Sequence, residues 1–217
     1  MAPGPITRIM VMGPPGSGKS TLARALAERL DLPVWHADAL FHGPGWVARP
    51  RDAFIADLAA IAAQSEWVID GNYSSAHYGR AIRDRLARAE RIILLDLPRR
   101  VTIPRILQRV ARYHGLQRPD SAAGCPERLD WEFLAYCWRW RSAVRPGILR
   151  VLEEAQDRVI RYQQPPTLER ILAPAPHAAR PPRHAPGVAR SPPPADPRRR
   201  ARSVPPCSRA ASDSRPR

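Results

Sequence analysis

The sequence "RIMVMGPPGSGKSTLARALAERL", residues 8–30, carries the strongest structural signal in the chain. An apolar run at 8–12 leads through a glycine-rich loop into a segment whose apolar residues recur every three or four positions. These two patterns predict a buried strand followed by an amphipathic helix from Ser20 to Leu30. Between them lies Lys19, the only lysine in a chain of 217 residues in which lysine and arginine together number 35.

The loop matches the pattern G-x-x-x-x-G-K-[ST] through Gly13, Gly18, Lys19 and Ser20. Glycines let the backbone curl so that several N–H groups point at phosphate oxygens, and the start of the helix adds its positive end. In such a loop the lysine reaches the β- and γ-phosphates of ATP, and the serine hydroxyl binds Mg²⁺. A guanidinium is larger and shaped for bidentate pairing, so it replaces this lysine poorly. The residues predicted to bind ATP are Gly13, Pro14, Pro15, Gly16, Ser17, Gly18, Lys19, Ser20 and Thr21.

Short apolar runs alternate with amphipathic stretches over the rest of residues 1–172. This alternation predicts an α/β fold, in which helices cover both faces of a parallel sheet. The predicted strands are 8–12, 32–38, 66–72, 91–97 and 157–162. The predicted helices are 20–30, 51–64, 81–90, 98–113, one or two between 127 and 155, and 167–173. We expect Pro104 to kink its helix or mark a second start, and Pro146 to break the helical segment after residue 127.

The last part of the chain, residues 173–217, has a different composition. It holds twelve prolines, ten arginines and two aspartates, and its largest apolar side chains are two valines. Such a segment buries too little apolar surface to offset the entropy lost on ordering, so we expect a disordered tail after a folded domain at 1–172. The tail carries +8 of the net charge of +15, which makes weak, non-specific contact with nucleic acid conceivable.

Several other classes of protein are disfavoured by composition. The three cysteines are far apart with no C-x-x-C spacing, so neither a disulfide framework nor a zinc site is expected. The six histidines also lack metal-ligand spacing. No apolar run reaches the roughly 18 residues of a membrane helix, and the N-terminal region does not resemble a signal peptide. We therefore expect a soluble, cytoplasmic protein without a membrane contact.

Three aspartates follow predicted strands, where ligands bind in open α/β sheets. Asp70 comes after three apolar residues, and we expect it to be the carboxylate on the Mg²⁺ side. Asp38 follows the second strand, and we expect it to face the acceptor of the phosphoryl group. The alternative for each is that it only caps a turn. Asp96 lies just before Pro98, so helix capping is the better prediction for it.

Arginines are candidates for neutralising the charge of a transferring phosphoryl group. Arg105 and Arg109 are four residues apart, hence on one face of the predicted helix 98–113, and they are the strongest candidates. Most of the other arginines in so basic a chain are expected to be solvated surface. The weaker candidates are Arg112, Arg139, Arg141 and Arg145.

Four segments together resemble one protein family: "MGPPGSGKSTLARALAERLDLPVWHADALF", "EWVIDGNYS", "RIILLDLPRR" and "DRVIRYQQP". They are similar to the adenylate kinase-related P-loop NTPases known as DNA topology modulation proteins (FlaR-like), over about residues 6–172. The resemblance implies a nucleoside monophosphate kinase-like core of three α/β/α layers around a five-stranded parallel sheet. It also implies an acceptor-binding segment at about 36–66 and a lid at about 109–130.

Two departures from adenylate kinases bear on the acceptor. Asp70 and Gly71 stand where those enzymes carry Asp-Gly-Phe-Pro-Arg, but Asn72, Tyr73 and Ser74 replace the last three residues. The missing arginine helps to hold the acceptor nucleotide there. The short segment "HADALFHGPGW" is closer in size to the acceptor arms of shikimate- and gluconate-type kinases, in which an aspartate similar to Asp38 contacts the acceptor hydroxyl.

These observations favour an ATP- and Mg²⁺-dependent phosphotransferase acting on a small molecule or a nucleotide. Lys19, Asp38, Arg105 and Arg109 are the predicted catalytic residues, and Ser20 with Asp70 the predicted metal ligands. Two alternatives remain open: a nucleotide-binding regulator that affects DNA topology through its basic tail, and an ATPase that needs no acceptor.

Overall fold

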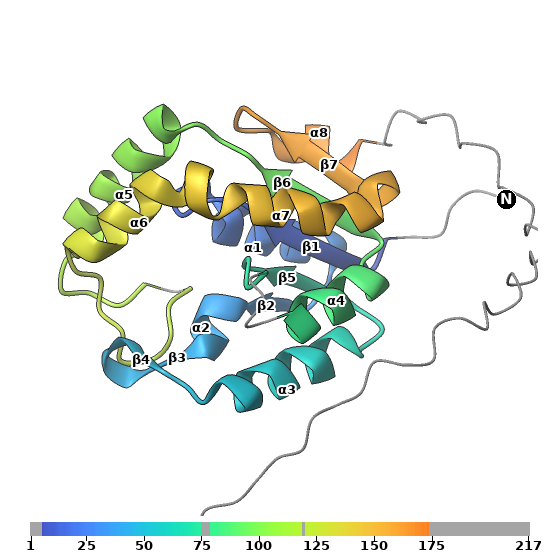
Figure 1. Ribbon diagram of the computed structural model, residues 1–217, viewed down its shortest axis with the longest axis horizontal. Coiled ribbons are helices and arrows are strands. Elements are labelled where there is room, and N and C mark those ends of the chain that lie inside the picture. Colours follow the sequence, from blue (N-terminus) through green and yellow to red (C-terminus); the bar gives the residue numbers. More distant parts are fainter. Residues whose placement is uncertain (1–5, 75–78, 119, 174–217) are drawn as a thin grey trace, which may run out of the picture. The chain divides into compact units, whose positions relative to one another are not determined.

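A five-stranded parallel sheet forms the centre of the protein (Figure 1). The computed structural model describes residues 6–74, 79–118 and 120–173. The strands lie in the order β2-β5-β1-β6-β7, so the first strand of the chain is central. Their bounds are β1 Arg8–Met12, β2 Val34–His36, β5 Trp67–Asp70, β6 Arg91–Leu95 and β7 Val159–Tyr162. The α/β fold with five parallel strands that the sequence predicted is confirmed.

Helices pack on both faces of this sheet. In Figure 1, α7 crosses one face of the sheet and α1 lies behind the other. The helices are α1 Lys19–Leu30, α2 Ala37–Phe41, α3 Arg51–Ala62, α4 Gly79–Arg88, α5 Arg99–Tyr113, α6 Trp131–Ala143, α7 Arg145–Leu152 and α8 Leu168–Leu172. A short hairpin, β3 His42–Gly43 and β4 Val47–Ala48, follows α2, and 3₁₀ turns span Pro44–Trp46 and Glu153–Arg158.

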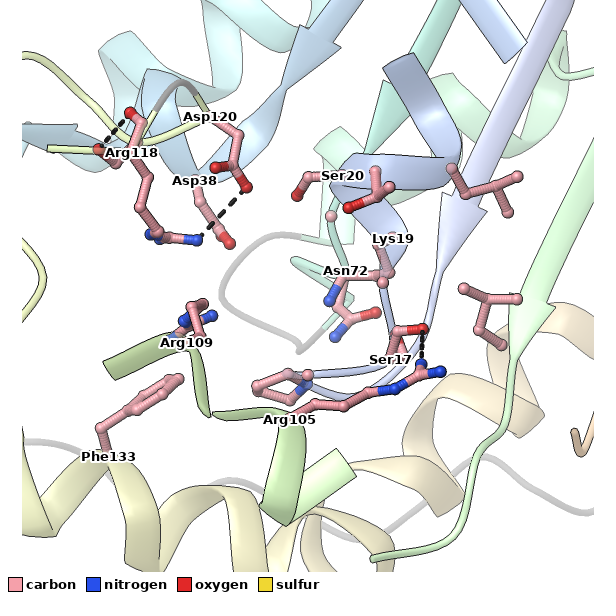
Figure 2. Close-up of a pocket in the computed structure, with 18 of the residues that line it drawn as sticks. Ser17, Lys19, Ser20, Asp38, Asn72, Arg105, Arg109, Arg118, Asp120 and Phe133 are labelled. Atoms are coloured by element: carbon pink, nitrogen blue, oxygen red, sulfur yellow. Dashed lines mark hydrogen bonds and ion pairs between the residues drawn. The ribbon is translucent and has the colours of Figure 1, made fainter. Parts of the chain in front are cut away.

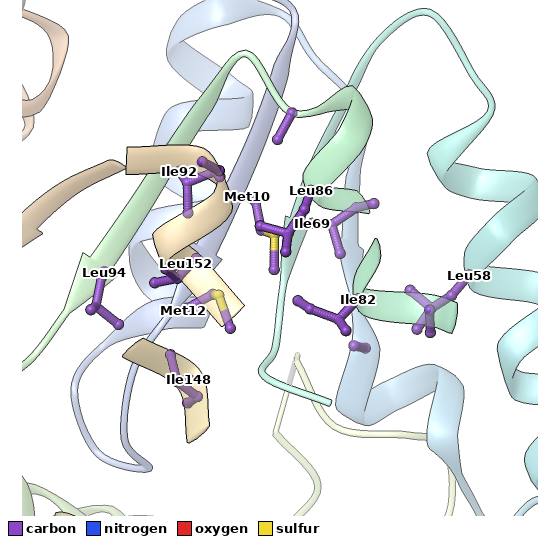
Figure 3. Close-up of a cluster of buried hydrophobic side chains, with 14 of the residues drawn as sticks. Met10, Met12, Leu58, Ile69, Ile82, Leu86, Ile92, Leu94, Ile148 and Leu152 are labelled. Atoms are coloured by element: carbon purple, nitrogen blue, oxygen red, sulfur yellow. The ribbon is translucent and has the colours of Figure 1, made fainter. Parts of the chain in front are cut away.

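The alternation of side chains along β1 divides the core into two clusters. Met10 and Met12 face α3, α4 and α7, where they pack in a cluster with residues such as Ile82 and Ile148 (Figure 3). Ile9 and the other odd-numbered core residue of β1, Val11, face α1 and α8 on the opposite side. Because successive strand residues point to opposite faces, an uninterrupted apolar strand is what a sheet covered on both sides requires. The result is a three-layer α/β/α domain.

The strand register brings the predicted site residues to one edge of the sheet. Asp70 is the last residue of β5 and lies opposite Val11 of β1 and His36 of β2. The loop after β1 begins at the same edge. In an open parallel sheet, the crevice beside the central strand, where the strand order reverses, is where ligands bind.

Three local expectations need correction or limitation. The predicted strand 32–38 is only Val34–His36, and Asp38 lies in the first turn of α2. No second helix starts at Pro104, because α5 runs as one helix from Arg99 to Tyr113 with Pro104 inside it; the alternative, a kink, stays a prediction. The helical segment does break next to Pro146, which lies in the first turn of α7.

The predicted tail lies outside the described residues, except for Ala173, which caps α8. In the described part of the chain, no helix is both long and apolar enough to cross a membrane.

Asp96 is not a helix cap, as the sequence had suggested, but the centre of a buried ion-pair cluster. The N-cap of α5 is Pro98. Asp96 is only 1% exposed and accepts hydrogen bonds from Arg145 Nε (2.8 Å) and Arg161 Nε (2.8 Å). Burial raises the pKa of this carboxyl, but the two guanidinium groups outweigh burial and bring the pKa below its ordinary value. Asp96 thereby joins the end of β6 to α7 and β7.

We expect Asp96→Asn to lower the free energy of unfolding by about 2–3 kcal/mol at pH 7, since two arginines lose their charged partner. The matched control is Asp84→Asn, which removes an exposed pair with Arg80 (3.8 Å) and should cost at most about 0.5 kcal/mol. Because the folded-state pKa is lowered, the contribution of Asp96 is present above its unfolded pKa of about 4 and is lost as the pH falls through the folded value. Urea unfolding from neutral to acidic pH measures both effects. Equal losses at the two positions would contradict this assignment.

Candidate active site

The loop between β1 and α1 has the geometry of an anion-binding loop. Gly16 and Gly18 adopt φ values of 76° and 90°, which side chains other than glycine rarely adopt. Helix α1 begins at Lys19, and its N-cap, Gly18, has no side chain that could cap the first N–H groups of the helix. The first N–H groups of the helix are therefore left for a ligand, and the helix dipole favours a negative one.

Close packing holds this phosphate loop, residues 13–20, against the rest of the domain. A Cβ at Gly13 would lie 2.5 Å from the Leu95 carbonyl oxygen. A Cβ at Gly16 would lie 2.4 Å from the Thr102 carbonyl oxygen and 2.8 Å from a carbon of Ile106. The loop can thus lie on β6 and α5 only because these two positions lack side chains.

A pair of hydrogen bonds ties the phosphate loop to the segment after β5. The Gly13 amide donates to Asn72 Oδ1 (3.0 Å), and Asn72 Nδ2 donates to the Gly13 carbonyl (2.9 Å). Arg85 of α4 is fully buried and donates to the carbonyl oxygens of Gly71 (3.0 Å) and Asn72 (2.9 Å). Burial lowers the pKa of Arg85 to about 10. This buried cation therefore fixes the segment whose asparagine holds the loop. Neither Asn72 nor Arg85 was among the predicted site residues, although an arginine on an otherwise apolar helix face was a visible signal.

Ser20 and Asp70, the two predicted metal ligands, are in direct contact. Ser20 Oγ donates to Asp70 Oδ2 (2.7 Å), and His36 Nδ1 donates to Asp70 Oδ1 (2.8 Å). Burial lowers the pKa of His36, but the bond to Asp70 and the charge of that carboxylate outweigh it and raise the pKa above its ordinary value. A hydroxyl and a carboxylate side by side are hard oxygen donors of the kind that Mg²⁺ prefers. In the described residues no cluster of three or more His, Cys, Asp or Glu offers a metal site, but Mg²⁺ beside phosphates needs only one or two protein ligands.

Lys19 lies at the centre of these groups. Its Nζ donates to the Pro14 carbonyl (3.1 Å) across the loop. Burial lowers the pKa of Lys19, while the carboxylates of Asp38 and Asp70 act in the opposite direction. The amine is thus held on the loop by the Pro14 carbonyl, within the influence of the Asp38 and Asp70 carboxylates.

A cavity of about 1170 Å³ opens from the phosphate loop toward α2 and the β3–β4 hairpin. Asp38 lines it and accepts a hydrogen bond from the Tyr73 hydroxyl (2.9 Å). Aromatic rings gather around this carboxylate: Phe41 lies 5.2 Å from Tyr73, and His42 lies 5.3 Å from Trp46, measured between ring centroids. Among the described residues, the buried Nδ1 of His42 has no hydrogen-bond partner. The predicted acceptor residue therefore lies in a largely aromatic part of the cavity.

Arginines line the cavity from α5 and from the loop that follows it. Arg105 reaches the Ser17 carbonyl (3.4 Å), and Arg109 donates to Glu127 Oε1 (3.0 Å) (Figure 2). Glu127 is 4% exposed and also pairs with Arg118 Nε (2.6 Å). One buried carboxylate thus aligns two arginines from different segments. Arg118 and Glu127 were missed because their pairing depends on how the loop folds.

Asp120 lies on the same loop and faces the phosphate loop. Arg118 Nη1 donates to Asp120 Oδ2 (3.3 Å), and Figure 2 shows Asp120 beside Ser20. Burial raises the pKa of Asp120, but the charge of Arg118 and a hydrogen bond from Ser20 outweigh burial, so the pKa lies below its ordinary value. Asp120 is therefore a further carboxylate in the cavity, one that the sequence did not indicate.

The weaker arginine candidates lie away from this cavity. Arg145 is bound to Asp96, and Arg141 lies 4.0 Å from the same carboxylate. Arg139 bonds to a carbonyl of its own helix, and Arg112 lies over the Tyr113 ring. None of these four weaker candidates lines the cavity. The buried Asp96 binds Arg145 and lies near Arg141 instead.

The loop after α5 also contacts the β3–β4 hairpin. The Gly45 amide donates to the Gly124 carbonyl (2.8 Å), and Trp46 Nε1 donates to the Pro126 carbonyl (2.9 Å). Cys125 Sγ lies 3.1 Å from the Gly43 carbonyl. These bonds join the two segments that border the cavity opposite the phosphate loop.

We expect Gly16→Ala to destabilise the protein by about 2–4 kcal/mol, because it adds both backbone strain and an overlap with α5. The matched control is Gly115→Ala: φ at Gly115 is 73°, nearly that of Gly16, but a Cβ there has nothing within 4 Å. The control should cost only about 1–2 kcal/mol. Thermal unfolding of the two variants measures the difference. Equal losses would show that the packing of the loop on α5 contributes nothing.

Comparisons with known proteins agree with this geometry. Residues 9–70 match the family "ATPase family associated with various cellular activities (AAA)". Cytidylate kinase of Aeropyrum pernix is 32% identical over 133 residues, which cover 56% of this chain and 73% of that protein.

A solved structure shares the fold at lower identity, and a second has a lower TM-score. Shikimate kinase from Acinetobacter baumannii in complex with shikimate has a TM-score of 0.50 and 18% identity, covering 77% of this chain and 88% of that one. A gluconokinase from Sinorhizobium meliloti 1021 has a TM-score of 0.44 and 19% identity, covering 76% and 87%. The phosphate loop, the parallel sheet and the similarity to cytidylate kinase lead to one conclusion: the chain belongs to the nucleoside monophosphate kinase-like family of P-loop NTPases.

Proposed function

We propose that this protein transfers the γ-phosphoryl group of ATP to a hydroxyl or phosphate oxygen of a small-molecule acceptor. One observation carries the proposal: a single cavity connects the phosphate loop to Asp38 and to the arginines of α5 and the following loop. An ATPase requires only the first of these parts. A phosphotransferase requires a second binding region beside the γ-phosphate, and this cavity is large enough for two ligands.

The donor end of the reaction is assigned to the phosphate loop. The N–H groups of residues 13–20 would bind the phosphates, and Lys19 would leave the Pro14 carbonyl to reach the β- and γ-phosphates. Ser20 and Asp70 would hold Mg²⁺, Asp70 directly or through water. Bound there, the ion would offset charge on the phosphate oxygens.

The acceptor end is assigned to Asp38. Its carboxylate would accept a hydrogen bond from the acceptor hydroxyl and take up the proton as the new P–O bond forms. The bond from Tyr73 holds one carboxylate oxygen in place and leaves the other for the substrate. Arg105 and Arg109 would offset the charge on the transferring group, with Glu127 positioning Arg109.

We expect Lys19→Ala to lower kcat by at least about 100-fold, since one preorganised cation near the transferring group is lost. The control is Arg24→Ala, which removes an exposed cation from the same helix and should leave kcat unchanged. Transfer of labelled γ-phosphate to a mixture of nucleosides, nucleoside monophosphates and hydroxylated metabolites measures the rate. Wild-type protein with no Lys19-dependent transfer to any acceptor would refute the proposal.

Asp38→Asn should lower kcat by about 100-fold or more while ATP affinity changes little, because the carboxylate acts on the acceptor and not on the donor. Tyr73→Phe removes only the bond that orients Asp38, so a loss of about tenfold is expected. Calorimetric titration with a non-hydrolysable ATP analogue separates binding from turnover. A large loss of nucleotide affinity in Asp38→Asn would move this residue to the donor side.

The alternatives raised by the sequence have distinct outcomes. Steady phosphate release from ATP alone, unaffected by acceptors, would make the protein an ATPase. The resemblance to one particular family, the DNA topology modulation proteins, stays a prediction. Contact with nucleic acid through the basic tail also stays a prediction. Removing residues 174–217 tests the latter: retention on DNA should disappear while phosphoryl transfer persists.

A further inference from the structure

The acceptor side of the cavity carries a negative charge and no matching cation. We define this side as the residues of segments 38–46 and 71–74 that line the cavity. Among these described residues, Asp38 is the one formally charged side chain. The adjoining positions 75–78 contain no lysine or arginine in the sequence. A negative group on the acceptor would therefore meet a carboxylate and no cation here.

The nearest arginines of this region are engaged elsewhere. Arg49 donates to the Leu40 carbonyl (2.8 Å) and to Asp57 (2.9 Å), and Arg51 pairs with the exposed Asp52 (3.4 Å). Neither lines the cavity. If Arg49 turned toward a ligand, both bonds would break and Asp57 would lose this partner. The charge of Arg49 is therefore not freely available to an acceptor.

The arginines across the cavity are already balanced by carboxylates. Arg109 and Arg118 share the buried Glu127, and Arg118 also pairs with Asp120. These four side chains together carry no net charge, so Arg109, which we assign to the transferring group, leaves no surplus cation here for a second anion on the acceptor. Arg128 also lines the cavity and pairs with Asp130 (3.8 Å). The remaining cations that line it, Lys19 and Arg105, lie on the donor side, where the phosphates of ATP would require them.

Aromatic rings complete the acceptor side. Phe41 and Tyr73 contact each other, and His42 packs edge-on against Trp46. The faces of such rings are negative, so they attract cations and pack well on the apolar faces of neutral ligands. Rings and carboxylate thus favour the same class of ligand.

We infer that the acceptor is a neutral or cationic hydroxyl compound, such as a nucleoside, a polyol or an amino alcohol, and not a phosphate ester or a carboxylate. This inference rests on the proposed phosphotransfer. It separates the chain from its relatives cytidylate kinase and shikimate kinase, whose named substrates are anions. The γ-phosphoryl group would pass from the oxygen that bridges the β- and γ-phosphorus of ATP to the acceptor oxygen, with ADP leaving and the hydroxyl proton going to Asp38.

The test uses the full chain with ATP labelled at the γ-phosphate. Small molecules of a deproteinised cell extract are separated by ion exchange into anionic, neutral and cationic pools, and Lys19→Ala serves as the blank. We expect Lys19-dependent labelling of products from the neutral or the cationic pool. Labelling from the anionic pool alone would overturn the inference and support the proposed function. No labelling from any pool would overturn both.

A charge added to the acceptor side provides an independent check. Ser74 lines the cavity, and Ser74→Arg would supply the missing cation, with Ser74→Gln as an uncharged control of similar reach. We expect Ser74→Arg to raise kcat/KM for cytidine monophosphate relative to cytidine, and for shikimate relative to its methyl ester, by about tenfold or more. The control should leave both ratios unchanged. Wild-type protein that prefers the anionic member of either pair, or equal ratios in the two variants, would contradict the inference.

Discussion

The two hydrogen bonds between Gly13 and Asn72 connect the parts of the site on which everything else depends. They join the start of the phosphate loop to the segment leaving β5, and they lie next to the contact between Ser20 and Asp70. Donor binding and the carboxylate edge of the sheet are therefore one structural unit. Arg85 supports this unit through its hydrogen bond to the Gly71 carbonyl. A fully buried guanidinium is tolerated only where carbonyl oxygens replace the water molecules that would otherwise bind it.

The same edge explains why the chain keeps a single lysine. Its other basic side chains apart from histidine are arginines, and some of these form fixed pairs, as Arg145 does with both carboxylate oxygens of Asp96. The phosphate loop needs a compact cation on a flexible stem that can exchange a carbonyl oxygen for a phosphate oxygen. Lys19, bonded to Pro14, has the position for that exchange.

The carboxylates of the site differ in what surrounds them. Asp96 has two arginine partners and belongs to the framework, whereas Asp38 has a tyrosine hydroxyl and aromatic neighbours. Asp70 bonds to a serine and a histidine. Three aspartates in similar sequence positions thus have three different environments, and Asp38, beside the aromatic rings, is the one that we propose binds the acceptor hydroxyl.

Local sequence determined the α/β class, most of the strands and helices, and the phosphate loop. These features depend on apolar periodicity and on glycine at fixed spacing, which are properties of neighbouring residues. Only the tertiary structure decided which charges pair. Asp96 pairs with Arg145, which was a candidate for the active site, and Glu127 pairs with both Arg109 and Arg118. Arg85 is buried and bonds to the Asn72 carbonyl. Partners in these ion pairs and buried hydrogen bonds are distant in sequence. Because the chain is so rich in arginine, its composition cannot distinguish a paired arginine from a solvated one.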